Sequence, residues 1–211
     1  MSGNDALEDI LSLCPVVPVL VVDDPDDAVK LGRALVAGGL RVLEVTLRTQ
    51  RAVDCLAAMA AGIDDAIVGA GTVLTEEHLT AAGDAGAQFA VSPGATPELL
   101  AAASRSPVPL LPGAATASEA MVLLEAGYSL QKFFPAEPSG GIAALKGIGG
   151  PLPQIRFCPT GGVGEHNAAD YLALPNVICV GGSWIVPADQ WQRRDWSGIE
   201  ANARRAVSQL A

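Results

Sequence analysis

The chain has 211 residues, of which 50% are hydrophobic and only 4% are aromatic, and its formal net charge is -10. This length suits one well-buried domain, so we expect residues 1–211 to form a single domain. The 13 basic residues are spread too thinly to form a stripe that would bind nucleic acid or an anionic membrane. No apolar run reaches the roughly 18 residues of a membrane span, and the polar start MSGNDALEDI is unlike a signal peptide. We therefore expect a cytoplasmic protein with neither nucleic-acid nor membrane partners.

Short apolar runs alternate with Ala-rich helical stretches after an amphipathic first segment at residues 4–13. The runs predict strands at about 16–22, 42–47, 66–71, 88–92, 108–111, 129–134, 154–158 and 177–181. Each strand is followed by a helical stretch or by the final helix, and eight such units predict an α/β fold, a (β/α)8 TIM barrel. Segment 4–13 is then an extra N-terminal helix at the bottom of the barrel. A doubly wound open sheet is the alternative.

The cysteines and histidines do not form a metal-binding pattern. The four cysteines lie far apart with no CxxC motif, which is typical of buried, reduced thiols rather than of a disulfide framework or a zinc site. With only two histidines in addition, we expect no metal and no cofactor.

Lys132 stands out among the three lysines because it lies inside the apolar run LQKFFP. Burial removes an ammonium from water and favours the neutral amine, which is a nucleophile toward carbonyl carbon. A lysine that forms a Schiff base is one interpretation. A structural ion pair in the barrel interior is the other.

Glu44 is the corresponding anomaly among the acidic residues, since it lies within the apolar second strand, in RVLEVTLRT. Strand alternation places Glu44, Thr46 and Arg48 on one face, and that face points into the barrel if the residues between them pack outward. A salt bridge between Glu44 and Lys132 would add little net stability for its desolvation cost. We therefore favour a nucleophile with a general acid/base beside it.

Polar groups at the ends of other strands suggest an anion site. Arg48 ends the second strand, where its guanidinium could hold a carboxylate with two parallel hydrogen bonds, although a solvated charge is the simpler interpretation. Thr72 in GAGTV could add a hydroxyl to the same anion or could cap the next helix. Pro93 in VSPG is a further substrate-binding candidate, although a proline there also simply ends a strand.

Two glycine clusters, FCPTGGVG and CVGGSW, follow the seventh and eighth strands. These two loops most often form the phosphate site of a TIM barrel, because glycine lets backbone N–H groups approach an anion closely. The phosphate candidates are Thr160, Gly161, Gly162, Gly181, Gly182 and Ser183. A phosphate site at one end and a lysine in the middle indicate a short phosphorylated carbonyl substrate.

Six segments together resemble the bacterial 2-keto-3-deoxy-6-phosphogluconate (KDPG) and 4-hydroxy-2-oxoglutarate (KHG) aldolases. These segments are VLEVTLRT, IVGAGTVL, FAVSPG, KFFPAE, RFCPTGGV and VGGSW, in this order over nearly the whole chain. The resemblance implies a class I aldolase, a homotrimer of metal-free (β/α)8 barrels. It implies cleavage of KDPG, a phosphorylated 2-keto acid of the Entner–Doudoroff pathway, to pyruvate and D-glyceraldehyde 3-phosphate, and cleavage of KHG to pyruvate and glyoxylate.

The resemblance also implies roles for single residues. Lys132 corresponds to the Schiff-base residue of the family, and Glu44 to its proton-transfer residue. Arg48 and Thr72 are similar to its contacts with the pyruvate carboxylate. The Thr-Gly-Gly and Gly-Gly-Ser segments correspond to its phosphate pocket.

Two segments depart from the family pattern near the strand ends. LPGAATASE carries Ala114 and Ala115 where bulkier or hydroxylated residues are common, and SPGATPELL carries Ala95 where Leu is frequent. The alternatives within aldolases are therefore 2-dehydro-3-deoxy-6-phosphogalactonate as substrate, or KHG as the main substrate. The alternatives from other classes are a noncovalent phosphate-binding barrel isomerase or synthase, and a non-catalytic sugar-phosphate sensor.

Overall fold

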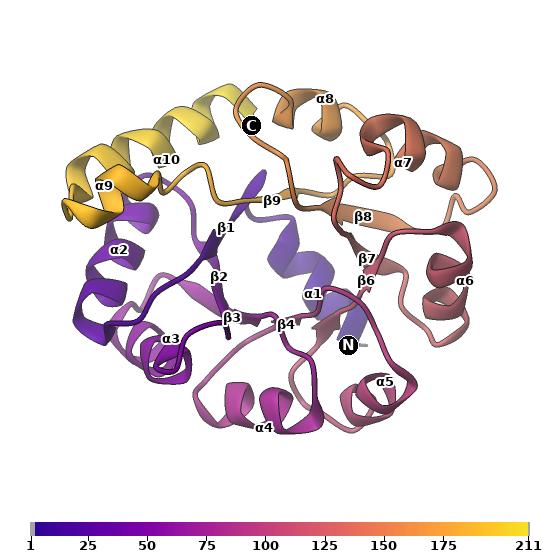
Figure 1. Cartoon of the computed structure of the whole chain (residues 1–211), viewed down its shortest axis with the longest axis horizontal. Coiled ribbons are helices and arrows are strands. Elements are labelled where there is room, and N and C mark those ends of the chain that lie inside the picture. The colour runs from indigo at the N-terminus through magenta and orange to yellow at the C-terminus, as the bar shows by residue number, and fades with distance from the viewer. Residues whose placement is uncertain (1–2, 211) are drawn as a thin grey trace.

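Parallel strands form a curled sheet with most of the helices packed around its outside (Figure 1). The computed structural model describes residues 3–210. The strands are β1 (Val16–Leu20), β2 (Val42–Thr46), β3 (Ile67–Gly71), β4 (Ala90–Val91), β5 (Leu110–Leu111), β6 (Gly113–Ala114), β7 (Leu130–Phe133), β8 (Arg156–Pro159) and β9 (Val180–Gly182). The helices are α1 (Gly3–Leu11), α2 (Pro25–Ala37), α3 (Ala52–Gly62), α4 (Glu76–Asp84), α5 (Pro97–Ala103), α6 (Ala117–Glu125), α7 (Gly141–Gly149), α8 (Ala168–Leu172), α9 (Ala188–Gln192) and α10 (Trp196–Leu210).

The strand pairing follows the chain order around the curled sheet. One sheet has the order β5-β4-β3-β2-β1-β9 and the other has the order β6-β7-β8. β5 and β6 are separated only by Pro112, which has no N–H for the ladder. Isolated parallel bridges from Phe157 to Val177 and from Thr160 to Gly181 link β8 to the stretch that ends in β9. This curled parallel sheet fits a TIM-like α/β fold, as the sequence predicted.

Several predicted strand limits are wrong. The strands predicted at 154–158 and 177–181 begin at Arg156 and Val180 instead. Ile155 and Val177 are buried, but the N–H of each donates to a carbonyl three residues earlier, in a turn. The predicted fifth strand also has a second part, β6, beyond Pro112. An apolar run in the sequence indicates burial, and the turns just before these two strands are buried as well. The apolar runs therefore extend beyond the strands.

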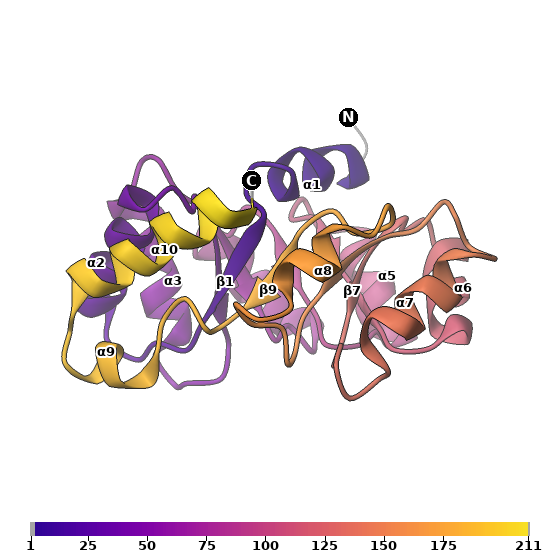
Figure 2. The ribbon, with the colours of Figure 1, turned by 90° about the horizontal axis from the view of Figure 1, so that it is seen from above.

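Helix α1 lies across one end of the strands (Figure 2). Asn4 Nδ2 donates to the carbonyl oxygen of Gly127 at 2.6 Å, and Glu8 pairs with Arg156, the first residue of β8. Both partners stand at the amino-terminal side of β7 and β8, so the carboxyl ends of the strands face away from α1. Within residues 3–210, no helix combines the length and apolar character needed to cross a membrane.

Strand β2 shows how the fold prepares a polar interior. Leu43 and Val45 are completely buried under the helices. The absent side chain of Gly32 on α2 leaves room for Ile63 and Met59, which a Cβ atom there would approach to 2.4 and 2.8 Å. Glu44 and Thr46 alternate with Leu43 and Val45 and are nearly as inaccessible, at 3% and 1% exposed. Residues on one strand alternate between the two faces of a sheet, so Glu44 and Thr46 lie on the face opposite to the helices.

Candidate functional site

A buried ion pair joins two strands that are far apart in the sequence. Lys132 Nζ, from β7, lies 3.4 Å from Glu44 Oε1, from β2, and the two side chains are only 6% and 4% exposed. The register places Lys132 opposite Gly113 and Cys158, and Glu44 opposite Val19 and Gly69. An amine and a carboxylate are therefore in contact inside the sheet, where little water reaches them.

Three neighbours set the geometry of this pair. A Cβ atom on Gly71 of β3 would lie 2.1 Å from Glu44 Oε1, so the glycine leaves the space that the carboxylate occupies. The Lys132 N–H donates to the carbonyl oxygen of Pro112 at 2.8 Å. The Phe134 ring centroid lies 5.2 Å from Lys132 Nζ, a cation–π distance. Sequence reasoning gave Phe134 no role, although it belongs to the quoted KFFP motif.

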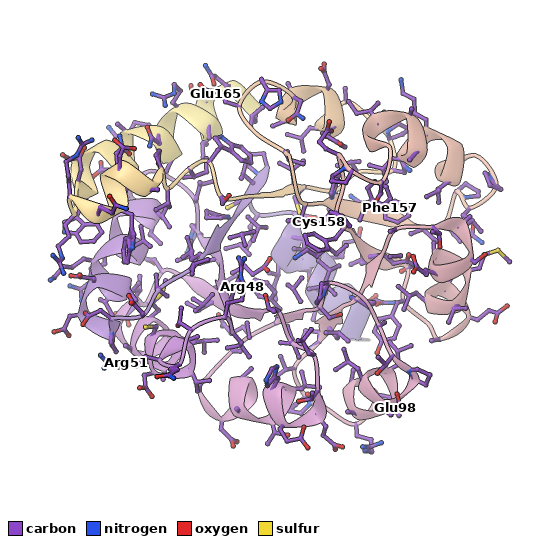
Figure 3. The ribbon with its side chains drawn as sticks, viewed as in Figure 1. Arg48, Arg51, Glu98, Phe157, Cys158 and Glu165 are labelled. Carbon is purple, nitrogen blue, oxygen red and sulfur yellow. The ribbon has the colours of Figure 1, made fainter. Side chains whose placement is uncertain are left out.

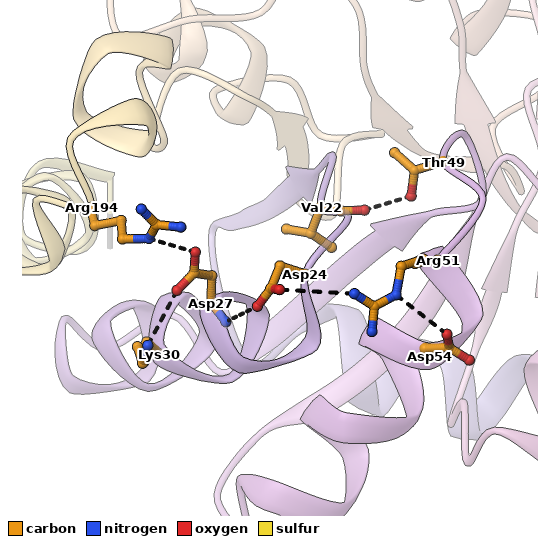
Figure 4. Close-up of polar contacts among 8 residues, drawn as sticks. All are labelled: Val22, Asp24, Asp27, Lys30, Thr49, Arg51, Asp54 and Arg194. Carbon is orange, nitrogen blue, oxygen red and sulfur yellow. Dashed lines mark hydrogen bonds and ion pairs between the residues drawn. The ribbon is translucent and has the colours of Figure 1, made fainter.

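Arg48 lies at the open end of the sheet, just beyond β2. Figure 3, which looks onto the end opposite α1, shows Arg48 over the middle of the ring of strands. Within residues 3–210 its guanidinium makes no hydrogen bond or ion pair. The Thr46 hydroxyl donates to the carbonyl oxygen of Leu20 at 2.7 Å. The Thr49 hydroxyl donates to that of Val22 at 2.6 Å (Figure 4), so the two bonds tie this segment to the end of β1 and the residues just after it. Arg48 is thus an exposed cation on an anchored segment.

Thr72 follows β3 in an uncommon backbone conformation. Its φ of 59° lies in the left-handed region, which β-branched residues rarely adopt. Thr75, and not Thr72, caps α4 by accepting a hydrogen bond from the His78 N–H. The structure therefore leaves the Thr72 side chain without the capping role that the sequence allowed, and such strain often accompanies ligand sites.

Pro93 borders a hollow of about 260 Å³ at the ends of β4 and β6. The lining also includes Phe134 and the small residues Ala95, Ala114 and Ala115. All three residues that depart from the family pattern therefore surround one space beside the ring that covers Lys132.

The loops after β8 and β9 lie against each other. Thr160 is 6% exposed, and a Cβ atom on Gly181 would lie 2.3 Å from its Oγ1. Gly161 and Gly162 have φ values of 98° and 82°, a conformation that favours glycine. The two predicted phosphate segments are thus adjacent.

The second segment is shaped by an aromatic ring that sequence reasoning did not assign to the site. A Cβ atom on Gly182 would lie 1.6 Å from the Trp184 ring, so only glycine fits beneath it. Ser183, between them, is exposed. In the described part of the chain, no hydrogen bond links Ser183 or Arg48 to Lys132 or Glu44. The two anion candidates are therefore not hydrogen-bonded to the buried pair.

The family model described as KDPG and KHG aldolase matches residues 7–202, a range that includes every candidate residue from Glu44 to Ser183. The chain belongs to the KDPG and KHG aldolase family. This aldolase is 54% identical to the KHG/KDPG aldolase of Escherichia coli K12 over 200 residues, covering 95% of this chain and 94% of the relative.

Solved structures of family members superpose closely on this aldolase. The KDPG aldolase of Legionella pneumophila, which holds pyruvate as a covalent carbinolamine intermediate, has a TM-score of 0.93 and 47% identity, covering 95% of this chain and 97% of that one. The KDPG aldolase of Zymomonas mobilis ZM4, solved with 3-phosphoglycerate, has a TM-score of 0.93 and 45% identity, covering 98% and 97%.

Proposed function

We propose that this class I aldolase cleaves KDPG to pyruvate and D-glyceraldehyde 3-phosphate through a Schiff base on Lys132, and that it also cleaves KHG to pyruvate and glyoxylate. The contact of 3.4 Å between Lys132 Nζ and Glu44 Oε1 in a buried site supports this proposal most directly. A covalent step needs an amine and a neighbouring group that takes its proton, and this pair places the two in contact. The carbinolamine of the Legionella relative is the first product of such a step.

The proposed reaction begins when the Lys132 amine adds to C2 of the keto acid and Glu44 accepts its proton. Glu44 returns the proton as the carbinolamine loses water, which gives an iminium. Glu44 then removes the proton of the C4 hydroxyl, the C3–C4 bond breaks, and its electrons pass to the iminium as an enamine. The aldehyde leaves, C3 of the enamine takes a proton, and water releases pyruvate and the free amine.

The remaining candidate residues bind the two ends of the substrate in this proposal. Arg48 and Thr72 hold the carboxylate, with Pro93 beside the carbon chain. The phosphate lies on the two glycine loops, whose members are Thr160, Gly161, Gly162, Gly181, Gly182 and Ser183. The left-handed backbone at Gly161 and Gly162 supports this assignment, because such turns can direct N–H groups toward an anion.

We propose further that residues 1–211 work as one domain, a closed (β/α)8 barrel with α1 as an extra helix over its amino-terminal end. The bridges that join β8 to β9 and the pairing of β9 with β1 support closure. We also propose a homotrimer without a metal or other cofactor. The cytoplasm is the proposed location, because its reducing conditions suit the four free, buried cysteines.

Borohydride reduction in the presence of pyruvate tests the covalent mechanism. Peptide mass spectrometry should locate a reduced pyruvate adduct on Lys132, and Lys132→Met should abolish it. Lys146→Ala is the matched control, because Lys146 is exposed on α7 and should leave trapping unchanged. If the folded protein forms no adduct, a noncovalent phosphate-binding barrel isomerase or synthase replaces the aldolase proposal.

Comparison of substrates tests specificity separately. KDPG, KHG and 2-dehydro-3-deoxy-6-phosphogalactonate should be assayed in parallel, and KDPG should give the highest kcat/KM. The hollow lined by Ala95, Ala114 and Ala115 is the observation that favours comparing them, because small residues there leave room beside Phe134. A higher kcat/KM for the galactonate substrate would transfer the proposal to that epimer.

A further inference from the structure

The loop after β7, the strand that carries Lys132, is hydrogen-bonded to the loop after β8. The Ala136 N–H donates to the carbonyl oxygen of Thr160 at 2.8 Å, and the Glu137 N–H donates to that of Gly161 at 3.0 Å. A Cβ atom on Gly162 would lie 2.6 Å from both Cβ and Cγ of Glu137. The Glu137 side chain therefore occupies the space that a larger residue at 162 would need.

A buried tyrosine holds the carboxylate of Glu137. The hydroxyl of Tyr171, on α8, donates to Glu137 Oε1, and Tyr171 is completely buried. Burial raises the pKa of the Tyr171 hydroxyl, and the hydrogen bond to Glu137 raises the pKa further, so the hydroxyl stays a donor at neutral pH. A Cβ atom on Gly141 would lie 3.1 Å from both Glu137 Oε1 and the Tyr171 oxygen. The two side chains are thus packed together at the start of α7.

We propose that Glu137 and Tyr171 are positioning residues that hold the Thr160–Gly162 loop in its anion-binding conformation and thereby set the affinity for the phosphate end of the substrate. This inference rests on the proposed function. Two successive glycines with positive φ have many other conformations available, so contacts from outside the loop must select this one. Glu137 supplies the backbone bond and the side-chain contact, and Tyr171 fixes Glu137.

Tyr171 also keeps the negative charge of Glu137 away from the anion-binding loop. A carboxylate beside an anion-binding loop would repel phosphate, or would compete with it for the N–H groups, if it were free to rotate. The bond from Tyr171 keeps Oε1 at the packed side near Gly141. Removal of the hydroxyl alone therefore should weaken phosphate binding although no residue that touches phosphate has changed.

The experiment compares Tyr171→Phe with Tyr128→Phe, a change at the only other tyrosine of the chain. KM and kcat are measured with KDPG and with KHG, which has no phosphate, and inhibition of KHG cleavage by inorganic phosphate is measured in addition. Tyr171→Phe should raise the KM for KDPG and the Ki for phosphate about three- to tenfold, the size of one ordinary hydrogen bond. The KM and kcat of Tyr171→Phe for KHG should stay within about twofold of the wild-type values. Tyr128→Phe should leave the KM and kcat for both substrates unchanged.

Changes at Glu137 complete the test. Glu137→Ala should reproduce the effect of Tyr171→Phe, whereas Glu137→Gln, whose amide oxygen still accepts from the tyrosine, should restore a low KM for KDPG. Glu137→Ala also serves as the second variant if Tyr171→Phe does not fold, because Glu137 is exposed. An unchanged phosphate Ki in Tyr171→Phe, or an equal rise in KM for both substrates, would overturn the inference.

The inference and the proposed function fail in different ways. If the wild-type protein does not cleave KDPG, the proposed function fails. Calorimetric titration with inorganic phosphate then still tests the positioning role of Glu137 and Tyr171. Weaker binding by Tyr171→Phe than by the wild type supports it, and equal binding overturns it.

Discussion

Lys132 and Glu44 form the buried ion pair on which the proposed mechanism depends. Two buried charges lose their hydration, and their attraction repays that loss only when they stay together. Gly71 leaves the space that the Glu44 carboxylate occupies, and the backbone N–H of Lys132 donates to the carbonyl oxygen of Pro112. These two features hold the side chains in contact. The pair is therefore costly to bury, and a change at either member should lower both stability and, if the proposed mechanism holds, activity.

Glu44→Gln keeps the shape of the side chain and removes its charge and its ability to accept a proton. We expect kcat for KDPG cleavage to fall about 10²- to 10⁴-fold, the usual contribution of a general acid/base. Slow borohydride trapping of pyruvate should survive, because Lys132 is still present. Steady-state kinetics checks the first expectation, and unchanged turnover would remove Glu44 from the mechanism.

Gly71→Ala tests the space beside the carboxylate. The new methyl would lie 2.1 Å from Glu44 Oε1, so Glu44 must move away from Lys132. We expect kcat to fall about tenfold to a hundredfold, as misplacement of a catalytic group by about 1 Å does. Gly147→Ala on α7 is the control, since a Cβ atom there meets nothing within 4 Å. Equal kinetics in the two variants would contradict the expectation.

At the scale of elements, helix α7 offers two glycines with opposite surroundings. Gly147 is exposed with open space around it, whereas a Cβ atom on Gly149 would lie 2.5 Å from Asn176 Nδ2. Alanine in place of an unobstructed helical glycine stabilises by about 0.5–1 kcal/mol. Gly147→Ala should therefore raise Tm by about 1–4 °C. Gly149→Ala should lower it, because Asn176 must leave its bond to the Leu145 carbonyl oxygen. Calorimetry of both variants distinguishes a general effect of alanine from this local one.

Helix α2 is tied to the turn before α10 through Asp27 (Figure 4). Burial alone would raise the pKa of Asp27, but hydrogen bonds from Arg194 and Lys30 outweigh it and hold the pKa below its usual value. Since the folded pKa is the lower one, the stabilising effect is complete above the unfolded pKa of about 4 and is lost as pH falls through the folded value.

Asp27→Asn should therefore lower the free energy of unfolding at pH 7. The difference from wild type should shrink as pH falls below about 4, where the wild-type carboxylate also takes up a proton. Urea unfolding of both proteins at several pH values measures this. A difference that stays constant down to acid pH would show that the charge of Asp27 is not its cause.

The sequence predicted the strands and the buried pair for different physical reasons. Lys132 and Glu44 could be found because charges inside apolar strands are rare, and because strand alternation decides which way they point. The roles of Gly71, Phe134 and Trp184 could not be found, because each depends on a distance between segments that are remote in the sequence or on one ring orientation. The break at Pro112 was missed because a single proline also fits the end of a strand.

At the scale of the whole molecule, Met121 and Val122 on α6 expose apolar surface, at 49% and 58%. Val122 also borders the hollow beside Phe134.

In the homotrimer that we propose, light scattering should give about three times the chain mass of 21.5 kDa. A mass of one or two chains at assay concentrations would contradict the trimer and leave the chemistry of the buried pair untouched.

The interruption of the sheet at Pro112 divides the candidate site residues between two parts of the chain. Everything before it carries Glu44, Arg48 and Thr72, and everything after it carries Lys132 and the glycine loops. Neither half alone contains both the amine and the carboxylate, although each contains complete βα units. We expect each half expressed alone to lack aldolase activity, so that cleavage of the substrate by a mixture of the two halves would report their reassembly.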